Sequence, residues 1–312
     1  MTIITTRTVN ISQAIRGHKS CMLNGKVYSI CSNHLLATSE LSIACIVARD
    51  SLLNVSYLRF NIATDLDVSS AAICRFGSVL LLAVPSPEHP LEFFTFCPET
   101  NQLKGIQGPA LPSRWRFSII EVRPNVVLLC GGDFVRKCYL LDFSKGTLSE
   151  TARLPFVASS MTLVALGNEL IAAPTFAVAG QFPTNKCLFY SISAGTWRVQ
   201  SLPIPEHTHY GTVALTDQLL LLLTPRAQEK GLLEFRGYIY NHETRIAYRM
   251  ERPDFPSYCD PVVFVHSGRL YVVGGLQNGK VSTNAHDLDL AALILCFKGT
   301  ELRSLLKEGL GI

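Results

Sequence analysis

Hydrophobic and polar residues follow one another along this chain in a unit that occurs six times. Residues 16–32, RGHKSCMLNGKVYSICS, show its first part: an apolar segment, a short polar turn and a second apolar segment. Two short apolar segments around a tight polar turn predict a β-hairpin. The first residues after the six turns are Val27, Val79, Val126, Leu170, Leu219 and Leu270, separated by 52, 47, 44, 49 and 51 positions.

Two further strands are expected after each hairpin. An aromatic-rich segment comes next (SYLRFN in the first copy, then EFFTFC, CYLLDF, CLFYSI and GYIYN), and a turn and a polar strand follow it. The innermost strands are nearly unbroken runs of Leu, Val and Ile, as expected where both faces are covered. Four strands in every 40 to 50 residues or so indicate propeller blades, which bury their faces by stacking around an axis. We therefore predict an all-β protein, a six-bladed β-propeller of four-stranded antiparallel blades, as one domain over residues 1–312.

Both chain ends have a predicted place in the ring. An open ring would expose two sheet edges, so we expect residues 2–11 to complete the last blade, whose other strands lie between Pro261 and Cys296. The alternative is that AALILCFKG supplies that strand. In residues 299–312 the leucines recur at helical spacing, which predicts a short C-terminal helix.

Several segments resemble the kelch repeat: IRGHKSCMLNGKVYSI, VVLLCGGDFVRKCYLLDF, LFYSISAGTWRVQSLPIP and GRLYVVGG. The resemblance covers the whole chain with degenerate repeats. The glycine pair that ends the second strand is kept at Gly131-Gly132 and Gly274-Gly275. The repeat's Trp is kept at Trp197, and Leu103, Leu148 and Ala247 take the equivalent places. The resemblance implies a kelch-like propeller that binds proteins, as relatives do when they deliver substrates to ubiquitin ligases or bind cytoskeletal filaments.

The composition of the chain limits the classes of partner and the cellular compartment that we expect. A net charge of +4 with scattered Lys and Arg lacks the dense basic stripe of nucleic-acid binders, so no nucleic-acid partner is expected. The chain has no signal-peptide pattern and no apolar run of about 20 residues, so no membrane partner is expected. The ten cysteines sit mostly in apolar runs without zinc-like spacing, which favours free thiols in a reducing, cytoplasmic compartment.

The sequence nominates no catalytic residue, metal or cofactor. His207 and His209 would face the same way on a strand, but no carboxylate or third His is near in sequence. SISAGTW differs from the sialidase turn because Ser193 stands where Asp belongs, and no nucleophile elbow, Walker loop or dinucleotide fingerprint is present. An enzyme acting on a small molecule or glycan in the central channel is the alternative to a binding protein.

A protein-binding face is the favoured interpretation. In each blade, the loop between strands two and three and the loop from strand four to the next blade emerge on the same face. The strand-four loops contribute Arg16, His18, Arg114, Trp115, Arg116, His207, His209, Tyr210 and Tyr258, and the other loops contribute Arg136, Lys137, Arg226 and Lys230. Aromatic and Arg side chains are the usual anchors of protein interfaces. We predict a non-catalytic interaction module with a protein partner of unknown identity.

Structural alternatives accompany these candidates. An Arg at the start of an inner strand can bond to carbonyls of neighbouring loops, and Trp115 can pack between blades instead of anchoring a partner. The insertion Ser32 to Asn54 contains LSIACIVA, which is either an additional strand, a docking site or part of the core.

Overall fold

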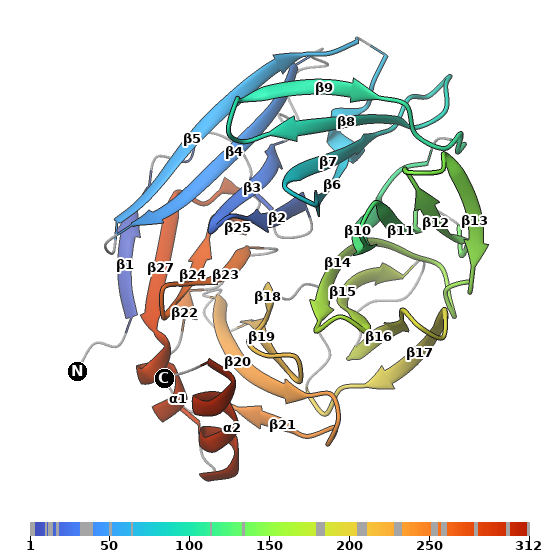
Figure 1. Cartoon of the computed structure of the whole chain (residues 1–312). Helices are drawn as coiled ribbons and strands as arrows, with labels where there is room; N and C mark the ends of the chain where they lie inside the picture. Colours follow the sequence, from blue (N-terminus) through green and yellow to red (C-terminus); the bar gives the residue numbers. More distant parts are fainter. Residues whose placement is uncertain are drawn as a thin grey trace.

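Six antiparallel sheets of four or five strands are arranged in a ring (Figure 1), which confirms the predicted six-bladed β-propeller. The computed structural model describes residues 4–9, 11, 15–16, 19–31, 40–49, 52–63, 65–112, 114–132, 135–178, 185–204, 211–227, 233–250, 255–256, 261–277, 280–297 and 300–310. Each sheet forms one blade, with its first strand nearest the axis and its fourth outermost.

The first five blades follow chain order. Blade one contains β2 (Ser20–Leu23), β3 (Lys26–Cys31), β4 (Glu40–Arg49) and β5 (Leu52–Asn61). Blade two contains β6 (Ala72–Phe76), β7 (Val79–Val84), β8 (Glu92–Cys97) and β9 (Gln102–Ile106), preceded by a 3-10 turn, Val68–Ser70. Blade three contains β10 (Phe117–Arg123), β11 (Val126–Gly131), β12 (Cys138–Asp142) and β13 (Thr147–Thr151). Blade four contains β14 (Ala158–Leu166), β15 (Leu170–Val178), β16 (Lys186–Ser191) and β17 (Thr196–Ser201). Blade five contains β18 (Gly211–Ala214), β19 (Leu219–Ala227), β20 (Leu233–Asn241) and β21 (Ala247–Arg249), and β22 (Phe255–Pro256) also pairs with β20.

Blade six joins the two ends of the chain. It contains β23 (Val262–His266), β24 (Arg269–Val273), β27 (Asn284–Asp289) and, outermost, the N-terminal strand β1 (Ile4–Thr8), which runs antiparallel to β27. A small hairpin of β25 (Leu276–Gln277) and β26 (Lys280–Val281) lies between β24 and β27 in sequence. The ring is therefore closed by strands from opposite ends of the chain.

The segment AALILC forms a helix, so the alternative that it supplies a closing strand is wrong. Helix α1 (Leu290–Leu295) begins after Asp289, whose side chain accepts hydrogen bonds from the backbone N–H groups of Ala291 and Ala292. Helix α2 (Thr300–Leu310) follows. Both helices bury apolar side chains against blades five and six. No helix in the described ranges is long and apolar enough to cross a membrane.

The unbroken apolar runs belong to the second strand of each blade, not to the innermost one as the sequence suggested. VLLLAV is β7 and VVLLCG is β11, and both strands are almost wholly buried. A second strand has a partner at each edge and a blade against each face, whereas a first strand leaves one edge toward the channel. Complete burial therefore falls on the second strand.

Blade one departs from the predicted strand order. SYLRFN lies in β5, the fourth strand, and the third strand is β4, which contains LSIACIVA. Leu41, Ile43 and Ile46 of β4 are fully buried, so this segment belongs to the core. The prediction used aromatic residues to mark the third strand, and β4 has none.

Two glycine pairs connect neighbouring blades, and we call them the glycine joints. Gly131 and Gly132 have φ angles of 72° and 117°, and the N–H of Gly132 donates to the carbonyl of Ala158 at the start of blade four. Gly274 and Gly275 have φ angles of 67° and 78°, and the N–H of Gly275 donates to the carbonyl of Ile15 ahead of blade one. Positive φ favours glycine at these positions. Each pair thus allows a backbone hydrogen bond between two neighbouring blades.

Candidate protein-binding surface

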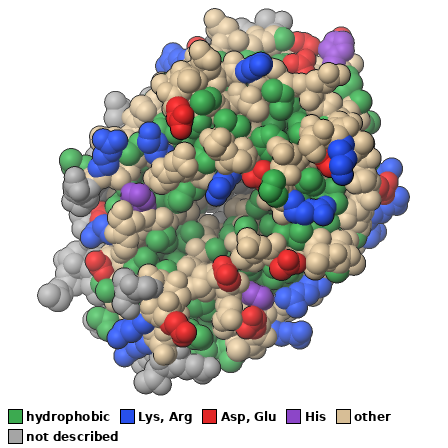
Figure 2. All heavy atoms as spheres, in the orientation of Figure 1, with side chains coloured by type: hydrophobic (Ala, Val, Ile, Leu, Met, Phe, Trp, Pro, Cys, Tyr) green, Lys and Arg blue, Asp and Glu red, His purple; other side chains and the backbone are tan. Residues whose placement is uncertain are grey.

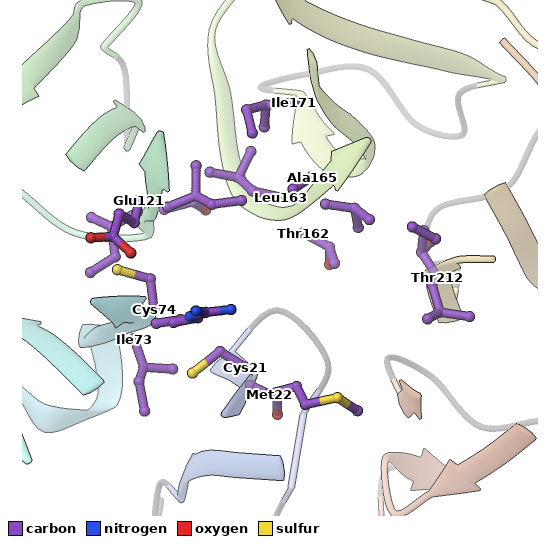
Figure 3. A pocket seen from close by; sticks show the side chains of 18 of the residues that line it. Cys21, Met22, Ile73, Cys74, Glu121, Thr162, Leu163, Ala165, Ile171 and Thr212 are labelled. Carbon is purple, nitrogen blue, oxygen red and sulfur yellow. The ribbon is translucent and has the colours of Figure 1, made fainter. Parts of the chain in front are cut away.

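A channel of about 890 Å³ passes between the six first strands. Figure 2 shows it as a hollow at the centre of the ring, with hydrophobic side chains and a Lys or Arg side chain at its edge. In the close view of Figure 3, Cys21 and Met22 of β2, Ile73 and Cys74 of β6, and Leu163 of β14 lie around this space. The channel wall is thus apolar over much of its area.

Two polar side chains of the channel, Glu121 and Ser118, stabilise the fold. The Glu121 carboxylate accepts the backbone N–H of Gly77 at 3.0 Å and that of Asn125 at 3.3 Å. The Ser118 hydroxyl donates to the carbonyl of Met161 at 2.7 Å. These bonds connect blade three to its neighbours and close its own first turn, so both side chains have structural roles.

Two channel thiols are poor nucleophiles. Burial raises the pKa of Cys21 to about 12, and burial also raises the pKa of Cys74 well above its ordinary value. The reactive form of a cysteine is the thiolate, so thiols that stay protonated at neutral pH are inert.

Metal ligands do not gather in the described residues, where no group of three or more His, Cys, Asp or Glu side chains is placed to hold an ion. The predicted site residues His18, His207, His209, Tyr210, Lys230 and Tyr258 lie outside the described ranges.

Five of the predicted residues come together on blade three, and we call this group the blade-three rim. It consists of Arg114, Trp115, Arg116, Arg136 and Lys137. The first three precede β10, and the last two precede β12. A hydrogen bond from the side chain of Arg114 to the carbonyl of Lys137 connects the two loops.

Arg114 is the structural centre of the rim. Its side chain is only 8% exposed, and Nη1 donates to the carbonyls of Gly131 and Lys137, each at 3.2 Å. The guanidinium also lies 5.0 Å from the centre of the Tyr139 ring, a cation–π distance. Burial lowers the pKa of this guanidinium from its usual value, but it stays charged at neutral pH. Arg114 thus bonds to carbonyls of neighbouring loops, which was the alternative to a role in binding a partner.

Trp115 and Arg116 are presented to solvent by a constrained backbone. Trp115 is 42% exposed, so much of its indole is not packed between blades. Arg116 has a φ of 55°, and its carbonyl accepts the N–H of Ser160 at 2.7 Å, a residue with a φ of 50°. Left-handed backbone at a residue other than glycine is strained and persists where the surroundings impose it. The Ser160–Arg116 hydrogen bond and the left-handed φ angle thus define the backbone of the loop at Arg116.

The rest of the rim is cationic. Arg136 is exposed, and its Nε donates to the carbonyl of Leu154 at 2.7 Å. Lys137 is exposed and lies 3.8 Å from Glu150, whose carboxylate also accepts Arg153 at 3.0 Å. Surface ion pairs of this kind contribute little to stability. Their side chains can therefore be used by a partner at little cost to the fold.

Two other predicted residues are placed differently. Arg16 is half-buried, and its carbonyl accepts the Ser20 hydroxyl at 2.6 Å. Arg226 was expected in a loop, but β19 extends through it and pairs it with Glu234 of β20. That expectation was wrong because the long ladder between β19 and β20 continues past Pro225.

Sequence reasoning missed the residues that support the rim. Tyr139 lies beneath Arg114, and Ser160 fixes Arg116 from the next blade. Tyr139 was available as the aromatic residue of CYLLDF, but it was used only as a strand marker.

Comparison with known proteins adds nothing to this geometry: no family model matches the chain, and no curated protein matches it.

Proposed function

We propose that this protein is a non-catalytic protein-binding module, kelch-like in its repeats, and that it binds its partner through the blade-three rim. The observation that carries the proposal is an exposed Trp115 beside a strained Arg116, on a loop already fixed by hydrogen bonds. Trp and Arg are the residues most enriched among binding hot spots.

Preorganisation makes this surface favourable for binding. Ordering a loop on association costs free energy, and a loop that is ordered beforehand avoids that cost. Arg114 and Ser160 fix the backbone on both sides of Trp115, so a partner that buries the indole gains apolar contact without ordering the chain.

The cellular role that we propose is that of an adaptor or scaffold in a reducing, cytoplasmic compartment, associated with a ubiquitin ligase or the cytoskeleton. Two features support it: the kelch-like glycine joints, and the nine described cysteines, all of which are free thiols. The channel supports a non-catalytic role, because its described thiols are protonated and its Glu121 is engaged by the backbone.

Affinity capture from cell extract followed by mass spectrometry tests the proposal when a matched pair of variants is included. The test variant combines Trp115→Ala with Arg116→Glu. The control combines Ile246→Ala with Arg245→Glu in the turn between β20 and β21, where Ile246 is 47% exposed and Arg245 has a φ of 63°. We expect a stoichiometric partner with the wild type and the control, and its loss with the test variant. Equal capture by all three proteins, or no stoichiometric partner with any, would overturn the proposal.

A further inference from the structure

Cys130 and Cys138 face each other across two strands of blade three. They are directly opposite in the antiparallel ladder of β11 and β12, and both are fully buried. Opposed residues in antiparallel strands have Cα atoms about 4.5 to 5.5 Å apart. A disulfide accepts Cα separations of about 4.4 to 6.8 Å, so the backbone is already placed for a bond.

The two cysteines lie at the end of the ladder, directly under the blade-three rim. Cys138 is the first residue of β12, and the exposed Arg136 and Lys137 precede it. Arg114 bonds to the carbonyls of Gly131 and Lys137, the residues adjacent to the two cysteines. Both sulfurs are buried, and strand ends open more readily than strand centres, so local opening at this end would give a small oxidant access to them.

The two thiols differ in acidity because they interact with each other. A hydrogen bond from Cys130 is the main cause of the lowered pKa of Cys138, and the Trp197 side chain adds to it. Burial and the same thiol partner raise the pKa of Cys130. Cys138 is therefore the better nucleophile, and Cys130 keeps a proton to donate.

We propose that Cys130 and Cys138 are a modification site at which a hydroperoxide forms a reversible intramolecular disulfide. The Cys138 thiolate attacks the terminal peroxide oxygen, the O–O bond breaks and sulfenic acid forms. The other peroxide oxygen takes up the proton that the Cys138 thiol released on ionising and leaves as an alcohol (water, for hydrogen peroxide). The Cys130 sulfur then attacks the Cys138 sulfur. The S–S bond forms, and the sulfenic oxygen leaves as water with the Cys130 proton. The two thiols are oxidised by two electrons, the peroxide is reduced, and a dithiol reverses the change.

This inference does not rest on the proposed function. The disulfide would close a loop over residues 131–137, which includes two residues of the rim, whatever the rim binds. Isolated buried thiols such as Cys187, whose pKa burial raises, lack an opposed thiol in the strand register.

Peptide mapping of the full-length protein tests the proposal. The reduced protein is treated with hydrogen peroxide, free thiols are blocked with N-ethylmaleimide, and the protein is digested with trypsin. Arg136 and Lys137 separate the cysteines, so the disulfide would link peptides 117–136 and 138–145. We expect this linked species, with the mass of the two peptides less two hydrogen atoms, and its loss after dithiothreitol.

Intrinsic fluorescence gives a second, independent measurement. Trp197 packs against the cluster containing both cysteines, and the protein has two tryptophans. Because disulfides quench neighbouring indoles, peroxide should cause a loss of Trp197 emission in the Trp115→Phe variant, restored by dithiothreitol. Cys138→Ala should abolish the response and Cys187→Ala should keep it. The proposal is overturned if folded, peroxide-treated protein shows both cysteines labelled by maleimide, oxidised singly or linked to other cysteines.

Discussion

Blades three and six make the same glycine joint but support the adjoining loop differently. In both, a pair of glycines at positive φ ends the second strand, and the second glycine donates to a carbonyl at the entry to the next blade. In blade six the following loop is closed by its own backbone, since Gly275 accepts the N–H of Ser282 and β25 pairs with β26. In blade three a side chain, Arg114, connects the strand ends instead.

This difference shows which residues of the rim serve the fold and which remain candidates for binding. Arg114 does for blade three what a hairpin does for blade six, so it is accounted for by the fold. The indole of Trp115 takes no part in the joint, because the joint's hydrogen bond runs from Gly132 to Ala158 and Trp115 is 42% exposed. Features that the fold does not require are the better candidates for binding.

The largest expected effect is at the glycine of the blade-three joint. A Cβ on Gly131 would lie 2.5 Å from the Ala158 carbonyl oxygen, whereas at Gly274 the nearest atom would be Ile15 Cβ at 3.2 Å. At Gly146, also at positive φ, nothing lies within 4 Å. We expect Gly→Ala to cost about 1 kcal/mol at position 146 from backbone strain alone and at least about 3 kcal/mol at 131. Position 274 should fall between them. Urea unfolding measures the series, and equal losses at all three positions would refute the role of the joint.

A pH effect of similar size is expected from blade six. His286 of β27 is 1% exposed, and burial lowers its pKa to about 4, although Asp287 acts in the opposite direction. The unfolded chain, with a His pKa near 6.5, binds the proton first, so the contribution is complete above pH 6.5 and is lost as pH falls toward 4. The loss is on the order of 3 kcal/mol. Unfolding free energies of the wild type and His286→Gln, measured between pH 7.5 and 4.5, should converge as pH falls; parallel curves would show that this histidine is not the cause.

Arg114→Met should have a smaller effect. The variant loses two hydrogen bonds to carbonyls and the contact with Tyr139, and we expect a loss of about 2 kcal/mol. Arg136→Met loses one exposed bond, to Leu154, and should cost about 0.5 kcal/mol. Chemical unfolding compares the two. If Arg136 proved the more important residue, the structural centre of the rim would have been assigned incorrectly.

The smallest change in stability is expected for Trp115→Ala, within about 0.5 kcal/mol, because much of the indole is in solvent. The same substitution should weaken partner binding at least tenfold, or about 1.4 kcal/mol, as for a hot-spot residue. Thermal unfolding and a binding titration with the captured partner measure the two quantities. A large loss of stability with unchanged affinity would make Trp115 a packing residue.

The sequence predicted the architecture well because propeller folding depends on a repeated pattern. The turn spacing specified six blades, and the Gly131-Gly132 pair specified a strand end. The predicted strand order failed in blade one, because β4 has no aromatic residue. The predicted loop at Arg226 was wrong, because the pairing of β19 with β20 continues through that residue. Local patterns report which face of a strand is buried but not how far its pairing continues.

The site was predictable only in part, for a related reason. Residue type made Trp115 and Arg116 candidate anchors, a prediction that the binding experiments test, but the role of Arg114 depends on carbonyls 17 and 23 positions further along the chain. The opposition of Cys130 and Cys138 depends likewise on the register of β11 and β12. Contacts of this kind become visible only when the loops are placed in space.

Hydroxyl-radical footprinting of captured complexes tests the central claim most directly, since it needs no knowledge of the partner. Trp115 on the rim is 42% exposed and Met22 at the channel is 37% exposed, and both side chains react readily with the radical. The account predicts that a bound partner protects Trp115 from oxidation while Met22 stays reactive. Protection of Met22 with Trp115 still oxidised would place binding in the channel and contradict the account.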